Sequence, residues 1–125
     1  MEFSAVNWPA LGLGTVLAYG LGMLWFSPKM FGPAWSKGSH NIRPPDSPPA
    51  AAMTVTFIGT LLLAVAVGLT EAAGTTTPAI AAILAAAALV AGMDLFSQKT
   101  VRATLIDAGY ILAGGGLMIL SHCLL

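Results

Sequence analysis

Apolar residues form long uninterrupted blocks along the chain, and short polar stretches separate the blocks. Four such blocks lie at about residues 8–26, 49–69, 78–97 and 101–124. Each block approaches the roughly 20 residues that a helix needs to cross a hydrocarbon core of about 30 Å. Strands are disfavoured, because an open strand in lipid leaves its backbone groups unpaired. The pattern therefore predicts an all-α fold, with residues 1–125 forming one domain that is a four-helix transmembrane bundle.

Composition supports the membrane class. Hydrophobic residues make up 57% of the chain and charged residues only 8%, about a third of the usual charged fraction. This small number of charged side chains cannot cover the surface of a soluble protein. The first expected partner is therefore the lipid bilayer. The net charge of zero gives no indication of a nucleic-acid partner. The single cysteine excludes an internal disulfide and a cysteine-rich metal site, and we expect neither a metal nor a cofactor.

Local signals mark where the helices begin. Pro9, Pro49 and Pro78 each open an apolar block, where the missing backbone N–H of proline costs nothing. Thr77 and Thr100 precede helical blocks and are predicted N-caps.

The basic residues predict a direction of insertion. All of them fall in the predicted first and third loops, whereas the second loop carries Glu71 and no basic residue. The positive-inside rule then places loops one and three in the cytoplasm and both termini on the non-cytoplasmic side. We expect a multi-pass protein of the bacterial inner membrane. The basic residues are Lys29, Lys37, Arg43, Lys99 and Arg102.

The predicted first loop, residues 27–48, is cytoplasmic and proline-rich. Its second half reads "RPPDSPPA", which favours an extended, polyproline-like backbone. We interpret this stretch as a stiff spacer; the alternative is a proline-motif ligand for a soluble partner.

An aromatic corner, "WFSPKMFGPAW", lies where the first block ends. Tryptophan rings favour the headgroup level of a membrane, and Pro28 disfavours helical geometry at the residue before it. Gly32 and Pro33 are expected to turn the chain. We interpret the corner as an interfacial anchor, and the alternative is a cap over the acidic residues described below. Its residues are Trp25, Phe26, Ser27, Pro28, Phe31, Gly32 and Trp35.

Small residues recur at helical spacing within the blocks. Such stripes let helix backbones approach closely inside lipid. They predict a tight four-helix bundle, with the alternative that one stripe faces a partner or a second copy. The candidate packing positions are Gly14, Ala18, Gly22, Thr56, Thr60, Ala64, Gly68, Gly109 and Ala113.

Two carboxylates are the best chemical candidates. Asp94 precedes the turn around Lys99 and Asp107 follows it, so an antiparallel hairpin places both about 10 Å from the turn. Tyr110 shares the face of Asp107. Ionisable residues within a span are functional candidates. The main interpretation is a structural ion-pair network at the cytoplasmic interface, comprising Asp94, Lys99, Arg102, Asp107 and Tyr110; the alternative is a proton or cation site.

Two motifs carry a family resemblance. "WFSPKMFGPAW" and "LIDAGY" resemble motifs of the bacterial domain-of-unknown-function 1761 family, small integral membrane proteins without an assigned activity. Phe26 stands where that family often has tyrosine, and Pro33 replaces a more typical polar residue. The resemblance implies a fold and a location, but no mechanism. The matching positions are Trp25, Ser27, Pro28, Phe31, Gly32, Ala34, Trp35, Asp107, Gly109 and Tyr110.

These observations favour a packing or accessory subunit that self-associates or joins a larger membrane complex. The alternative is an oligomeric small-solute or ion transporter or channel. Its four spans are similar to those of small multidrug transporters, but those carry a glutamate in the first span and this chain has no acidic residue there. An enzyme is not expected, because no nucleophile and base are spaced as a pair.

Overall fold

The fold is all-α over the part of the chain that the computed structural model describes, residues 3–43 and 46–125. The predicted fold class is therefore confirmed. The elements in chain order are η1 (Phe3–Ala5), α1 (Trp8–Trp25), α2 (Gly32–Gly38), α3 (Ala50–Ala72), α4 (Thr77–Phe96) and α5 (Val101–Leu124).

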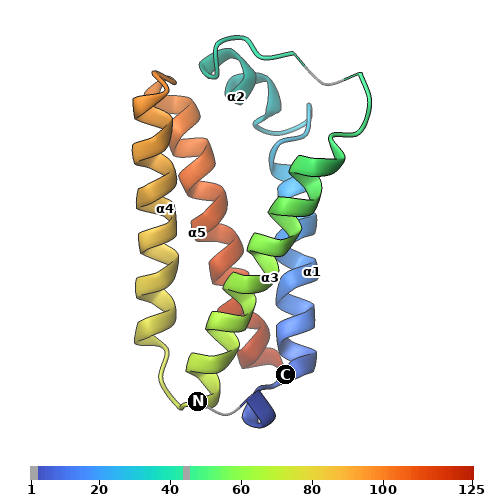
Figure 1. Ribbon diagram of the computed structural model, residues 1–125, viewed down its shortest axis with the longest axis vertical. Coiled ribbons are helices and arrows are strands. Elements are labelled where there is room, and N and C mark those ends of the chain that lie inside the picture. Colours follow the sequence, from blue (N-terminus) through green and yellow to red (C-terminus); the bar gives the residue numbers. More distant parts are fainter. Residues whose placement is uncertain (1–2, 44–45) are drawn as a thin grey trace.

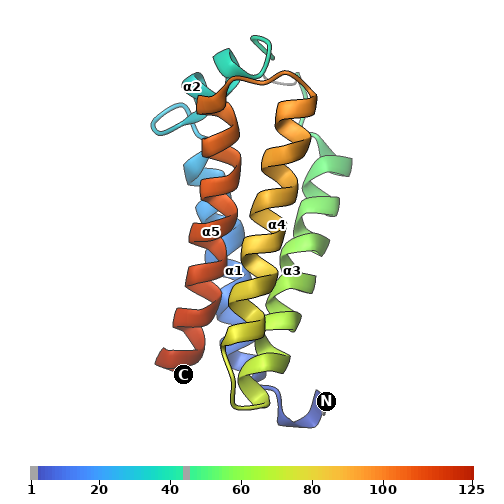
Figure 2. The ribbon, with the colours of Figure 1, turned by 90° about the vertical axis from the view of Figure 1, so that its left-hand side faces the viewer.

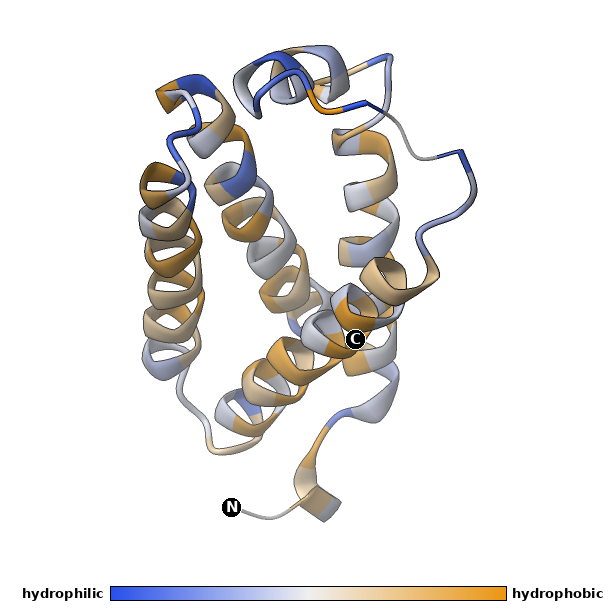
Figure 3. Ribbon diagram, turned by 45° about the horizontal axis from the view of Figure 1, so that its top comes forward, coloured by the Kyte–Doolittle hydropathy of each residue, from blue (hydrophilic) through white to orange (hydrophobic). Residues whose placement is uncertain are grey.

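The four long helices run side by side, and the short helix α2 lies across one end of them (Figure 1, Figure 2). Helices α1, α3, α4 and α5 are each long and apolar enough to cross a membrane. Hydrophilic segments gather near α2 and the α4–α5 turn, which we call the α2 end (Figure 3). The helix η1 and the C-terminal end of α5 lie at the opposite, terminal end (Figure 1).

The helix boundaries differ from the predicted ones by a few residues. Helix α3 continues to Ala72, beyond the predicted residue 69, since "TEA" follows without a helix breaker. The prediction of Thr77 as an N-cap was wrong: Thr76 is the cap and Thr77 the first helical residue. Thr100 is confirmed as the cap of α5, because its side chain accepts a hydrogen bond of 3.2 Å from the backbone N of Ala103.

The predicted first loop contains a helix that the hydrophobic pattern did not reveal. Gly32 and Pro33, expected only to turn the chain, begin α2, because proline is well suited to the first helical turn. A Cβ atom on Gly32 would lie 2.6 Å from the carbonyl oxygen of Phe26, so this tight corner requires glycine. Pro44 and Pro45 of the predicted spacer lie outside the described residues, and Pro49 is the N-cap residue of α3.

Helices α1 and α5 form the closest seam of the bundle. A Cβ atom on Gly14 would lie 3.0 Å from the Cα of Met118, and one on Gly114 would lie 3.5 Å from the Cβ of Ala18. Gly22 faces the Tyr110 ring in the same way. Small residues thus let two backbones approach, as the stripe on α1 predicts.

Helix α3 packs along only part of its length. Ala64 is 1% exposed, and Gly68 lies against Leu11 and Val6. The segment 50–59, which includes Thr56, is exposed throughout. The predicted stripe on α3 is therefore used at the terminal end and left open at the α2 end. Thr60 and Ala113 are half-buried.

Candidate functional site

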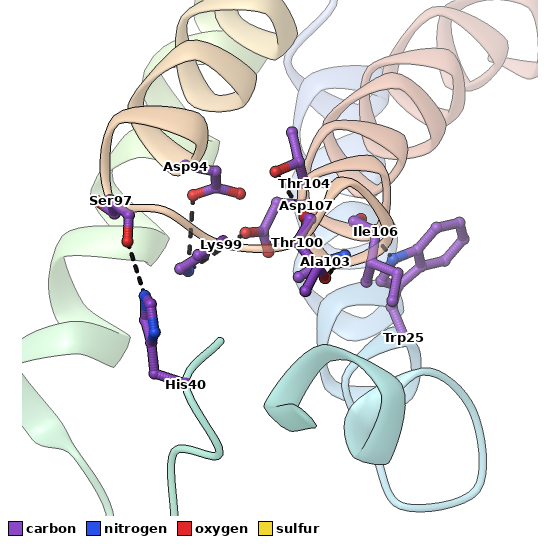
Figure 4. Close-up of polar contacts among 10 residues, drawn as sticks. All are labelled: Trp25, His40, Asp94, Ser97, Lys99, Thr100, Ala103, Thr104, Ile106 and Asp107. Atoms are coloured by element: carbon purple, nitrogen blue, oxygen red, sulfur yellow. Dashed lines mark hydrogen bonds and ion pairs between the residues drawn. The ribbon is translucent and has the colours of Figure 1, made fainter. Parts of the chain in front are cut away.

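An ion cluster joins α4, α5 and the turn between them. The Nζ atom of Lys99 lies 3.6 Å from Oδ1 of Asp94 and 3.6 Å from Oδ2 of Asp107. The two carboxylates approach from neighbouring helices with the lysine between them (Figure 4). The three side chains are 11–21% exposed, so the pairing is mostly shielded. The hairpin geometry brings these residues together.

Arg102 lies outside this cluster. Its side chain is exposed, and both ion pairs found in the described part of the chain involve Lys99. Residues five apart on a helix point about 140° away from each other, so Arg102 and Asp107 cannot share a face. The interpretation of Arg102 as a member of the network was wrong for this reason.

The aromatic corner lies directly over the cluster. The Lys99 ammonium sits 5.0 Å from the centroid of the Trp35 ring, close enough for a cation–π interaction. The Phe26 ring contacts both Trp35, at 5.7 Å between centroids, and Tyr110, at 5.6 Å. The cap interpretation required Trp35 to lie near the acidic face, and it does.

The corner also binds the α5 backbone. The indole Nε1 of Trp25 donates a 2.9 Å hydrogen bond to the carbonyl oxygen of Ile106 (Figure 4), and a Cβ atom on Gly109 would lie 3.3 Å from the same indole. The Tyr110 hydroxyl donates a 2.9 Å bond back to the carbonyl of Ala18. The two motifs, far apart in the sequence, thus form one interface.

Helix α2 is held over the site by its C-terminal end. The backbone N of Thr100 donates a 3.0 Å hydrogen bond to the carbonyl oxygen of Gly38. A Cβ atom on Gly38 would lie 2.7 Å from Ala103, so glycine permits this approach. His40 is exposed, and its Nε2 lies 2.7 Å from the carbonyl oxygen of Ser97 (Figure 4). Hydrophobic patterning gave no signal for Gly38 or His40.

Two surface-open cavities flank the first half of α3. One, here called the inner cavity, has a volume of about 420 Å³ and lies between α3, α4 and α5. The other, the aromatic cavity, has a volume of about 740 Å³ and lies between α1, α2, α3 and α5. Both are lined in part by Phe26, Thr56, Asp107 and Tyr110. The open stretch of α3 thus stands over hollow space rather than packed side chains.

Several polar atoms at the site are buried without a hydrogen-bond partner among the described residues. They include Oδ2 of Asp94 and Nε1 of Trp35. A buried polar atom without a partner is costly, so the site retains unused hydrogen-bonding capacity. Over residues 3–43 and 46–125, no three His, Cys, Asp or Glu side chains are placed to hold a metal ion.

Comparison with known proteins gives one match. A family model described as "Protein of unknown function (DUF1761)" matches residues 9–124, which is nearly the whole chain and includes both motifs. No curated protein and no solved structure was found to match.

Proposed function

Since the chain belongs to the DUF1761 family of proteins of unknown function, and since its four long helices suit a multi-pass membrane protein, we propose that it is a non-catalytic accessory subunit that works in an assembly. The assembly is a homo-oligomer or a larger membrane complex. The observation that carries the proposal is the open stretch of α3, residues 50–59, beside the inner cavity.

Packing physics favours an assembly. The hydrophobic effect does not drive helices together inside lipid, so helix association depends mainly on close van der Waals packing between small residues. The open stretch of α3 has small residues at positions that the rest of the bundle leaves uncovered, notably Thr56 and Gly59. A Cβ atom on Gly59 would meet nothing within 4 Å, so a side chain from another helix has room there.

The orientation belongs to the same proposal. All of the Lys and Arg residues lie in the segments that meet at the α2 end, and the positive-inside rule favours a cytoplasmic location for such an end. Both termini are then outside a bacterial inner membrane. Cys123, the only cysteine and exposed, provides a test: a membrane-impermeant maleimide should label it in intact spheroplasts but leave the variant Cys123→Ser/Lys29→Cys unlabelled. The reverse labelling pattern would contradict this orientation.

Assembly is tested by gentle extraction from the native membrane followed by mass measurement of the intact complex. We expect a homo-oligomer or a fixed partner, and Gly59→Leu should dissociate it. Gly20→Leu is the matched control, because Gly20 is also exposed on a long helix and its Cβ would also meet nothing. A protein that is extracted as a monomer, or an assembly that Gly59→Leu leaves intact, contradicts the proposal.

A second candidate is an oligomeric transporter or channel for a small solute or an ion. Asp107 and Tyr110 favour it, because they line both cavities from within a predicted span, and ionisable groups in spans often mark solute pathways. We expect Asp107→Asn to disturb folding or assembly before it alters transport. A variant that assembles normally but loses solute flux in proteoliposomes would favour the transporter instead.

A further inference from the structure

The aromatic cavity combines a volume, a lining and a charge that fit one class of ligand. Its 740 Å³ lies within the range of about 300–1,000 Å³ that is typical of small-molecule sites. Four aromatic side chains line it, contributed by α1, α2 and α5, together with one carboxylate. These residues are Tyr19, Phe26, Trp35, Tyr110 and Asp107.

The aromatic rings form connected walls rather than isolated contacts. Phe26 contacts Trp35 and Tyr110, each at less than 6 Å between centroids. Tyr19 lines the same cavity and contacts the Phe57 ring on α3, and its hydroxyl donates a 3.2 Å bond to the carbonyl oxygen of Met53. The faces of aromatic rings carry negative charge density and attract cations, most strongly when water is excluded.

Two carboxylates share one ammonium group beside the cavity. Asp94 and Asp107 share the single ammonium of Lys99, and the described residues offer these carboxylates no other ion pair. Asp94 also keeps one buried oxygen without a hydrogen-bond partner. Of the two carboxylates, Asp107 is the one that lines the aromatic cavity, so a cation that enters the cavity meets it.

The protein already stabilises an ammonium group at this place. Lys99 lies over the Trp35 ring and between the two carboxylates. The surroundings therefore suit an amine or quaternary ammonium head, while the apolar walls of α1 and α3, including Met23 and Met53, suit a hydrocarbon part.

The geometry points to a binding site for an amphiphilic organic ammonium ion in the aromatic cavity, with its charged head against Asp107 and the rings of Phe26 and Trp35. The site is made by one copy of the chain, and Ala52, Met53 and Thr56 of the open α3 stretch form part of its lining. The site also requires α2 to lie against the bundle, because α2 contributes Trp35 to the cavity lining.

The test uses the full chain in lipid nanodiscs and radiolabelled octyltrimethylammonium as the probe, with empty nanodiscs as the measure of partition into lipid. We expect saturable binding above that background. Unlabelled octyltrimethylammonium should displace the probe at least about tenfold better than octyl sulfate or octyl glucoside, which share its tail, because the cation is the recognised part. Equal displacement by the three compounds would overturn the inference, because it would mean that the protein binds only their shared hydrocarbon tail.

Variants separate recognition from folding. Because Asp107→Asn is also expected to disturb folding, its binding is measured on the fraction that keeps the native thermal midpoint, where it should be weaker at least about tenfold. Asp46→Asn, at an exposed acid that does not line the cavity, should leave binding unchanged. Ala52→Trp fills the cavity from exposed α3 and leaves the residues of the ion cluster unchanged, so it should abolish binding while the thermal midpoint is retained. Undiminished binding by a folded Ala52→Trp protein would also overturn the inference. The oligomeric state of the same samples, read by mass, tests the assembly independently.

Discussion

Along α1 the small residues Gly14 and Ala18 lie against α5, whereas along the first half of α3 the small residues Ala52 and Thr56 line hollow space. Both stripes follow the same four-residue spacing and both lie in apolar helices. The spacing therefore shows that a helix face can accept a close neighbour, but it does not show whether a neighbouring helix is present. What differs is how the two helices are fixed.

Helix α1 is fixed to α5 near both of its ends. Trp25 and Tyr110 each donate a hydrogen bond to a backbone carbonyl oxygen across the seam, to Ile106 and Ala18 respectively, and Gly14 meets Met118 farther along. Helix α3 is fixed at its terminal end, where Ala64 and Val67 are buried and the short segment 73–76 leads into α4. Its other half is attached to α1 through Tyr19, whose hydroxyl donates an exposed bond to Met53 and whose ring contacts Phe57 at 5.5 Å between centroids.

The largest expected effect comes from adding bulk to each stripe. Gly14→Leu should lower the free energy of unfolding by about 2 kcal/mol, because the new side chain meets the Met118 backbone and overpacks the seam. Thr56→Leu should change it by less than about 0.5 kcal/mol, since position 56 is exposed. Unfolding in detergent, followed by circular dichroism, measures both. If the two variants lost equal amounts of unfolding free energy, the distinction between the α1–α5 seam and the open face of α3 would be wrong.

The two tyrosines provide a smaller, isosteric comparison. Tyr110→Phe removes a partly buried hydrogen bond across the seam and should cost about 1 kcal/mol. Tyr19→Phe removes an exposed bond to α3 and should cost only a few tenths, about 0.3 kcal/mol. The same unfolding measurement applies. A larger loss for Tyr19→Phe would mean that the first half of α3 is held more firmly than its burial indicates.

The smallest effect on stability is expected from a pair of cysteine reporters in a Cys123→Ser background. Thr15 is 4% exposed in the seam, whereas Thr56 is exposed beside both cavities. Neither Thr→Cys change is expected to unfold the protein. A small maleimide should modify residue 56 much faster than residue 15, because the reaction needs an accessible thiolate. Equally slow modification would indicate that another helix covers the open face, and mass measurement would identify it.

Much of the candidate site was predictable, for a local reason. Asp94, Lys99 and Asp107 lie close together because a short turn forces two adjacent helices into a hairpin, and sequence spacing fixes the depth of each residue. Arg102 was misplaced because the same spacing argument ignored rotation around the helix. Helix α2 was missed because seven residues with two glycines and a proline carry no helical hydrophobic period.

By itself the sequence determined that the chain is helical, that it has four membrane-length spans, and that its basic residues gather at one end. These properties follow from hydrophobic run length and from the order of charges, which need no knowledge of distant contacts. Only the tertiary structure decided which small-residue stripe meets a partner and that Trp35 comes to rest over Lys99. Those outcomes depend on how loops position whole helices, and the close packing that selects one arrangement acts between residues far apart in the chain.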